Sequence, residues 1–162
     1  MGASICGNCA KGKYSDARAG ACTDCPVGEI SAAGAPSCIA CNTTHGLVAP
    51  TAGMSVCNYC GPGKSASTIT KQCVSCTRGK YSLGGLDYCL DCPDGQVTTE
   101  TGAVSCSVCP PGSSNNDDGT GCNSCLPGRF AVGTDCALCE NGFVSESGQS
   151  FCTVCLAGRY SR

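Results

Sequence analysis

The sequence predicts an elongated, rod-like tandem array of small disulfide-rich repeats, mostly β-hairpin or irregular, with almost no helix and no large hydrophobic core. Three observations predict this fold class. Cysteine makes up 20 of the 162 residues, more than the ~8–10% typical of a disulfide scaffold. Leu, Ile, Val and Phe together number only 24 of the 162 residues, fewer than the ~20% a chain normally needs to offset its ordering entropy. Finally, every cysteine belongs to a Cys-x-x-Cys pair, and these pairs recur along the whole chain.

The spacing of the pairs predicts the domain organisation. Successive pairs are separated by 10 to 15 residues, most often 12, and the two-residue gap inside a pair never changes. We therefore expect one continuous array of about ten units over residues 1–162, a fragment of a longer array cut mid-repeat at both ends. The pairs are Cys6/Cys9, Cys22/Cys25, Cys38/Cys41, Cys57/Cys60, Cys73/Cys76, Cys89/Cys92, Cys106/Cys109, Cys122/Cys125, Cys136/Cys139 and Cys152/Cys155.

Two glycine positions repeat with the cysteines. The first, here called the turn glycine, lies three residues after the second Cys in nine of the ten units; in the tenth, two inserted residues delay it to Gly46. The second, here called the loop glycine, lies four residues before the next pair at Gly34, Gly53, Gly85, Gly102 and Gly148. Because glycine readily adopts positive φ, both positions predict turns. A large apolar residue and then Ser, Thr or Ala often follow the turn glycine, which predicts a very short strand.

The repeat symmetry favours one pattern of disulfides. If every unit follows the same rule, the second Cys of each pair bonds to the first Cys of the next pair. The expected bonds are Cys9–Cys22, Cys25–Cys38, Cys41–Cys57, Cys60–Cys73, Cys76–Cys89, Cys92–Cys106, Cys109–Cys122, Cys125–Cys136 and Cys139–Cys152. Cys6 and Cys155 would then have no partner within the chain and would bond to flanking units. Pairings that skip a unit remain open, because a sequence does not fix connectivity.

Cys-x-x-Cys pairs can also serve two other chemistries, zinc binding and thiol–disulfide exchange. Two such pairs separated by 12–20 residues also form a four-thiolate zinc signature. Five zinc sites would make the spacings alternate, and the observed spacings do not. A redox-active pair needs a lowered thiol pKa, usually at a helix N-terminus, and no window has helical periodicity. Disulfides are therefore the favoured interpretation, and we expect no metal, no cofactor and no catalytic residue.

Charge and hydropathy exclude several further classes of function. The formal net charge is −2 and only 14% of the residues are charged, so nothing favours binding to nucleic acid or to an acidic membrane. No apolar run approaches the length of a membrane span. The opening stretch "MGASICGNCA" has no apolar core of a signal peptide. If the protein is secreted, we expect its targeting signal to lie outside this chain.

One candidate modification site stands out. The "NTT" stretch beginning at Asn42 is an N-glycosylation sequon. It lies in the one inserted turn, which we expect to be exposed. Asn42 is therefore the candidate for a glycan.

At this point the repeats resemble a known family. "CTDCPVGEISAAGAPSCIAC" and "CLDCPDGQVTTETGAVSCSVC" are similar to the ephrin-receptor-like cysteine-rich repeat, which is related to the modules of tumour-necrosis-factor receptors and to EGF-like modules. Several units depart from its pattern, because proline follows the second Cys only at Pro26, Pro93 and Pro110. The resemblance implies an extracellular, disulfide-linked segment of a large surface protein.

These observations lead to a first functional hypothesis. We expect a non-catalytic, extracellular or cell-surface structural module: a disulfide-stapled rod or spacer that could pack into filaments. Its expected partners are other copies or flanking repeats of the same protein, and glycans, with no nucleic acid and no membrane contact. The alternative is a ligand-binding receptor or adhesin ectodomain. That alternative predicts one unit with a different surface, and the longer unit 41–57 and the shorter unit 125–136 are its candidates.

Overall fold

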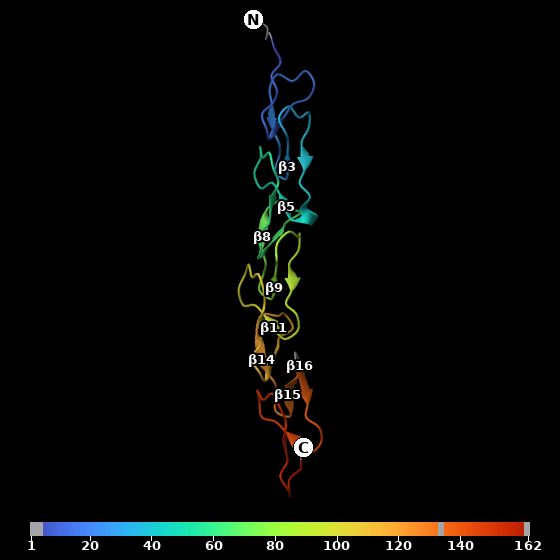
Figure 1. The fold of residues 1–162 in the computed structure, drawn as a ribbon, viewed down its shortest axis with the longest axis vertical. Helices are drawn as coiled ribbons and strands as arrows, with labels where there is room; N and C mark the ends of the chain where they lie inside the picture. The colour runs from blue at the N-terminus through green and yellow to red at the C-terminus, as the bar shows by residue number, and fades with distance from the viewer. Residues whose placement is uncertain (1–4, 133–134, 161–162) are drawn as a thin grey trace. The chain divides into compact units, whose positions relative to one another are not determined.

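The computed structural model describes residues 5–132 and 135–160. The outermost residues of the expected array, 1–4 and 161–162, lie outside this part. Within it, the regular structure consists of nine two-stranded antiparallel hairpins and a single 3-10 turn (Figure 1). The predicted fold class, small disulfide-rich repeats with short strands and almost no helix, is confirmed.

The chain divides into two compact units, and the first contains residues 1–75 and 83–88. Four hairpins and the 3-10 turn η1 (Thr43–His45) form it. The paired strands are β1 (Lys13–Tyr14) with β2 (Thr23–Asp24), β3 (Glu29–Ile30) with β4 (Ile39–Ala40), β5 (Leu47–Val48) with β6 (Asn58–Tyr59), and β7 (Lys64–Ala66) with β8 (Cys73–Ser75).

The second compact unit contains residues 76–82 and 89–162. Five hairpins of the same kind form it. The paired strands are β9 (Lys80–Tyr81) with β10 (Leu90–Asp91), β11 (Gln96–Val97) with β12 (Ser107–Val108), β13 (Ser113–Asn115) with β14 (Cys122–Ser124), β15 (Arg129–Val132) with β16 (Asp135–Leu138), and β17 (Phe143–Val144) with β18 (Thr153–Val154).

The first hairpin shows how the repeat produces such short strands. The Lys13 N–H donates to the Ala10 carbonyl at 3.1 Å, and Gly12 between them has φ +79°. A positive φ at the third residue is the arrangement of a type II turn, which glycine adopts without steric cost. The Cys25 N–H then donates to the Gly12 carbonyl at 2.9 Å. The strand after the turn glycine therefore pairs with the two residues inside the next Cys pair.

Cysteine sulfur and small side chains form the interior. Cys25, Cys60, Cys76 and Cys125 are each at most 2% exposed, whereas many of the larger apolar side chains lie at the surface. The apolar cluster of buried residues consists of Val48, Cys60 and Ala66, with Cys73 packed against it. Because cysteine is among the side chains most often buried, cross-linked sulfur fills the place that branched aliphatic residues take in larger domains.

Candidate functional site

The nine disulfides are the chemical feature that repeats along the chain. Each joins the second Cys of one pair to the first Cys of the next, so the nine bonds coincide with the pairs that symmetry favours. Their Cα atoms lie 5.4–5.9 Å apart, as is usual for disulfides. Among the described cysteines, the exposed Cys6 and the half-buried Cys155 carry no disulfide. Below, loops 1 to 9 are the segments that these nine disulfides close, in chain order.

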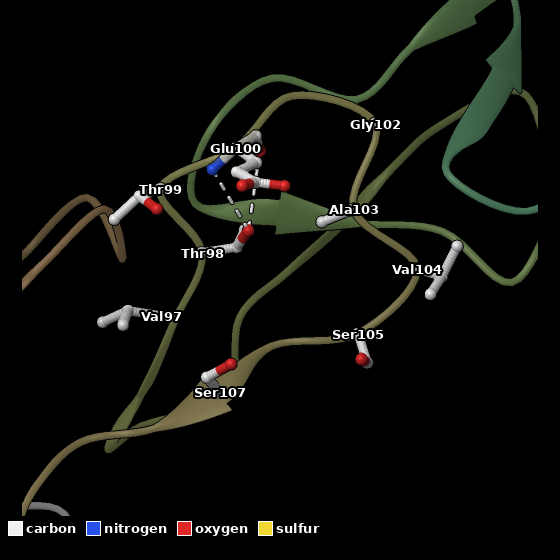
Figure 2. A pocket seen from close by; sticks show the side chains of 9 residues that line it. All are labelled: Val97, Thr98, Thr99, Glu100, Gly102, Ala103, Val104, Ser105 and Ser107. Carbon is white, nitrogen blue, oxygen red and sulfur yellow. Dashed lines mark hydrogen bonds between the residues drawn. The ribbon is translucent and has the colours of Figure 1, made fainter.

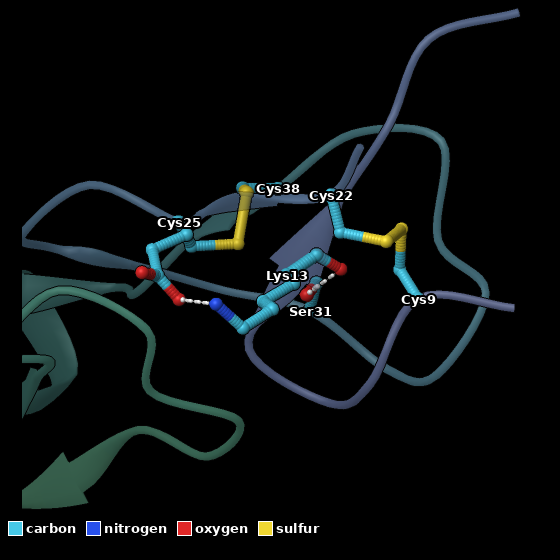
Figure 3. A network of polar contacts seen from close by, with 7 residues as sticks. Cys9, Lys13, Cys22, Cys25, Ser31 and Cys38 are labelled. Carbon is cyan, nitrogen blue, oxygen red and sulfur yellow. Dashed lines mark hydrogen bonds and ion pairs between the residues drawn. A yellow bond between two sulfur atoms is a disulfide. The ribbon is translucent and has the colours of Figure 1, made fainter. Parts of the chain in front are cut away.

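Loops 1 and 2 show how neighbouring units contact each other (Figure 3). The Ser31 hydroxyl of loop 2 donates to the Lys13 carbonyl of loop 1 at 2.9 Å. The Lys13 ammonium group in turn lies 2.7 Å from the carboxylate of Asp24. This ion pair is half exposed on both sides, so it adds little to stability. The hydrogen bond of the buried hydroxyl contributes more to the junction than the ion pair does.

Two reciprocal backbone hydrogen bonds also join loop 1 to loop 2. The turn glycine of loop 1, Gly12, donates its N–H to the Ser31 carbonyl of loop 2 at 3.0 Å. The loop glycine of loop 2, Gly34, donates its N–H back to the Cys9 carbonyl at 2.8 Å. Each glycine position therefore supplies one donor, and the two donors point in opposite directions along the chain.

The same two bonds recur at three further junctions. They are Gly28 to Ala49 with Gly53 to Cys25, Gly79 to Thr98 with Gly102 to Cys76, and Gly128 to Ser145 with Gly148 to Cys125. A fifth loop glycine, Gly85, makes the corresponding bond to the Cys60 carbonyl at 3.0 Å. All five loop glycines therefore donate to the Cys that opens the preceding loop. The sequence marks these glycines as turns, and their role as donors between loops becomes visible only in the structure.

The residue three positions after the turn glycine is buried at six of its nine described positions and half-buried at Ser15, Asn115 and Ala131. Ser31, Ser82, Thr98 and Ser145 there are at most 9% exposed, and Ala49 and Ala66 are fully buried. The large apolar residue just before it is less consistent: Val48 is 1% exposed and Tyr160 is 73% exposed. A small side chain is needed because the neighbouring loop's turn glycine approaches its backbone closely enough to hydrogen-bond to it.

Turn glycines also contact loops two places further along. A Cβ built on Gly12 would collide with the carbonyl oxygen of Gly53 in loop 3, and one on Gly112 with that of Gly148 in loop 9. In the same way, a Cβ on Gly46 would collide with the backbone of Gly85, and a Cβ on Gly79 with the carbonyl oxygen of Asp118. In all four cases the covering residue is four positions before the next Cys pair. Each turn glycine of this set is therefore covered by the turn of the second loop after it.

Of the two candidate units for a different surface, unit 125–136 has the longest hairpin. Its strands β15 and β16 have four residues each, against two or three elsewhere in the described chain. A hollow of about 310 Å³ beside this hairpin is lined mainly by apolar side chains, among them Phe130, Leu138 and Phe143. Leu138 is 67% exposed. This unit therefore combines the longest strands of the described chain with an exposed apolar surface beside them.

The inserted turn of unit 41–57 presents the glycosylation candidate. Asn42 is exposed and caps η1, and its side-chain oxygen accepts from the Thr44 N–H at 3.2 Å and from the Thr44 hydroxyl at 2.6 Å. The expected exposure holds for Asn42, Thr44 and His45, whereas Thr43 is buried. After the insertion, Gly46 has φ +68° and its carbonyl accepts from the Cys60 N–H at 2.8 Å. Gly46 therefore has the positive φ of a turn glycine and makes the same hydrogen bond to the second Cys of the next pair.

A second hollow, of about 580 Å³, lies within loop 6 (Figure 2). Its polar lining includes Thr98, Glu100, Ser105 and Ser107. The Thr98 hydroxyl lies within hydrogen-bonding range of the Glu100 backbone, so it closes the loop on itself. A single carboxylate without a neighbouring acid or base does not make an acid–base pair. The lining therefore offers no set of groups for catalysis.

Loop 7 holds a carboxyl group whose pKa is lowered, that of Asp118. The Thr120 hydroxyl donates to Asp118 Oδ1 at 2.6 Å, and the Thr120 N–H donates to the same oxygen at 3.1 Å. These bonds favour the charged form and hold the pKa of Asp118 below its ordinary value. Their effect is local, because this side chain is exposed.

The described ranges offer neither a metal site nor a membrane-spanning helix. No group of three or more His, Cys, Asp or Glu residues could hold a metal ion there. A sulfur in a disulfide is not a thiolate and cannot serve as one. Within the same ranges, no helix has the length and apolar character needed to cross a bilayer.

Comparison with known families identifies one stretch. Residues 63–109 match the family described as tyrosine-protein kinase ephrin type A/B receptor-like. This stretch runs from a turn glycine through loops 5 and 6, and it is similar to the cysteine-rich repeat of that family, so the resemblance seen in the sequence is confirmed for it. The family is a non-catalytic, extracellular type of receptor module. No curated protein matches the chain.

Proposed function

We propose that this chain is a structural segment of a large secreted or cell-surface protein, acting as a disulfide-held spacer that can assemble into filaments. The observation that carries the proposal is the repeated junction: each hairpin is closed by its own disulfide and joined to a neighbour by backbone hydrogen bonds. A linear array of such units needs no common core, since each unit is stabilised by its neighbours. The coarser assignment, an extracellular disulfide-rich module, follows from the family match.

The exposed sequon supports the extracellular part of this proposal. Asn42 uses its side-chain oxygen for Thr44, and its amide nitrogen, the atom that a glycan is attached to, takes no part in those bonds. We propose that Asn42 carries an N-linked glycan when the protein passes through a secretory pathway. The mass of the secreted chain before and after enzymatic deglycosylation tests this, and Thr44→Ala should abolish the difference.

The spacer role is tested by the chemistry of its cysteines. Intact mass after alkylation without reduction should show modification of Cys6 and Cys155 only, and metal analysis should find no zinc. Native protein should resist a protease that rapidly cuts the reduced and alkylated chain. Widespread alkylation of the native chain, or about two zinc ions for every eight cysteines, would contradict the proposal.

A further inference from the structure

The disulfides create a short covalent path along the chain. Each bond closes one loop, and the next loop begins three residues after the first one closes. If the chain is pulled lengthwise, the load therefore passes from Cys9 across the disulfide to Cys22, through two residues to Cys25, and across the following disulfide. The residues inside a loop carry none of this load, because the disulfide holds the Cα atoms at the two ends of the loop 5.4–5.9 Å apart.

This path limits how far the oxidised chain can extend. A fully extended chain spans at most about 3.3–3.6 Å per residue, so a loop that closes over 13 residues would span about 45 Å without its bond. With the bond intact, loop 1 contributes 5.6 Å. Between Cys9 and Cys152, the taut path through the disulfides measures about 130–140 Å, against roughly 500 Å for the reduced chain. Disulfides therefore exclude most of the chain from extension.

The two strands of a hairpin differ in burial in a way that matches this path. The strand between the two Cys of a pair carries the load, and its partner strand belongs to the unloaded loop. In four hairpins, both residues of the loaded strand are exposed, whereas both residues of the partner strand are half-buried or buried; these are β1–β2, β3–β4, β5–β6 and β11–β12. In these hairpins the load runs along the exposed strand.

Tension should separate neighbouring loops while each loop stays closed. Loops 1 and 2 are joined by the backbone hydrogen bonds from Gly12 to Ser31 and from Gly34 to Cys9. Such bonds are weak beside the covalent path that runs parallel to them. When the loaded strand between the loops straightens, these contacts are therefore lost first. Cysteines that are buried where loops meet then become accessible to solvent.

In the folded chain, burial protects some of the disulfides from a thiol reductant. Four of the nine bonds contain a Cys that is at most 2% exposed, namely Cys25, Cys60, Cys76 and Cys125. Reduction begins when a thiolate attacks one sulfur and expels the other as a thiolate. The buried sulfur is inaccessible to attack, and attack on its partner expels a thiolate into a site where burial disfavours the charge. In Cys92–Cys106 and Cys109–Cys122, by contrast, both Cys residues are half-buried.

We propose that this segment is a load-bearing tether whose length is controlled jointly by tension and by a dithiol reductant. Tension exposes the protected disulfides, and each bond that is then reduced lengthens the chain by about 40 Å. In each event the dithiol gives two electrons and two protons to the two protein sulfurs and itself becomes a disulfide. This role rests on the proposed spacer function and adds a mechanical property to it. Without reductant the chain stays at its taut limit, and without tension the protected bonds persist.

The first test is single-molecule extension at constant force. The full oxidised chain carries Cys6→Ser and Cys155→Ser and is held by cysteine-free protein handles fused to its two ends. We expect no extension beyond the taut limit until dithiothreitol is added, and then one step for each reduced bond. Most steps should be about 40 Å, with one of about 50 Å from Cys41–Cys57 and one of about 32 Å from Cys125–Cys136.

Paired substitutions assign the steps to individual bonds. Cys41→Ala/Cys57→Ala should abolish the longest step and make the chain about 50 Å longer before dithiothreitol is added. The matched control, Cys60→Ala/Cys73→Ala, should instead lose one step of about 40 Å and keep the longest one. Extension beyond the taut limit before reduction, or steps that do not follow the loop lengths, would overturn the proposal.

The second test compares the relaxed chain with the stretched one. In the relaxed chain, dithiothreitol followed by alkylation and peptide mapping should show Cys125–Cys136 reduced about tenfold more slowly than Cys109–Cys122. Under tension, the 32 Å step of Cys125–Cys136 should appear as early as the others. Equal rates in the relaxed chain, or a step that stays late under tension, would refute control by tension. Neither result changes which cysteines of the unreduced wild-type chain are alkylated, so failure here is distinguishable from failure of the spacer role.

Discussion

The carbonyl oxygen of Gly148 lies directly over the Cα atom of Gly112, at a place where a Cβ could not fit. Glycine is therefore required at position 112 for two separate reasons, positive φ and close backbone approach. At Gly128, by contrast, φ is also positive but the space above the Cα atom is open. Comparing substitutions at the two positions therefore distinguishes the cost of positive φ from the cost of steric collision.

Gly112→Ala should therefore destabilise the protein more than Gly128→Ala. Both variants incur the cost of a Cβ at positive φ, about 1 kcal/mol. Only Gly112→Ala also forces the Gly148 carbonyl to move, which should add about 1–3 kcal/mol. Denaturant unfolding of the two variants measures the difference. Equal losses would mean that loop 9 yields without cost and that the close approach is not a constraint.

The buried small side chains give a second prediction. Ser31 is 2% exposed and its hydroxyl donates to the Lys13 carbonyl, so Ser31→Ala should cost about 1 kcal/mol of unfolding free energy. Ser31→Val should cost about 1–3 kcal/mol, because a branched side chain overfills a position next to a neighbouring backbone. Ser37 in the same loop is exposed. Ser37→Ala therefore serves as the control and should change the unfolding free energy by no more than about 0.5 kcal/mol. A Ser31→Val variant as stable as the wild type would show that packing does not require a small side chain at this position.

The pH dependence of loop 7 gives a third prediction. Hydrogen bonds from Thr120 lower the pKa of Asp118 in the folded state. A lowered folded-state pKa contributes stability above the unfolded pKa, and this contribution is lost as pH falls through the folded value. Thr120→Ala should move the titration of Asp118 to higher pH, and Thr120→Ser, which keeps the hydroxyl, should change it less. Carboxyl NMR titration measures both; identical midpoints in all three proteins would show that these bonds do not persist in solution.

Much of the architecture could be predicted from spacing, and the residues explain why. A constant Cys-x-x-Cys gap with variable loops allows one pairing rule for all units, and the two-residue strands follow from a turn glycine placed three residues after a Cys. The contacts between loops could not be predicted. The sequence pattern marks Gly34 as a turn, but it does not show that the Gly34 N–H donates to the Cys9 carbonyl of the preceding loop.

The contribution of individual disulfides gives the last prediction. Cys60–Cys73 and Cys139–Cys152 have the same sequence separation of 13, so loop-closure entropy predicts an equal loss of about 3 kcal/mol when either is removed. Cys60 is 2% exposed and packs with Val48 and Ala66, whereas Cys139 is half-buried.

Cys60→Ala/Cys73→Ala should therefore lose about 1–2 kcal/mol more than Cys139→Ala/Cys152→Ala, because it also leaves a cavity beside Val48. Paired substitutions avoid creating a free thiol, and mapping the remaining eight disulfides by peptide mass verifies the native connectivity. Unfolding midpoints in guanidinium chloride measure the total loss, and hydrogen exchange of the backbone amides at positions 60 and 139 measures it locally. Equal losses would assign the disulfides' contribution to chain entropy alone. A larger loss at Cys60 would show that buried sulfur also stabilises the repeat as a core side chain does.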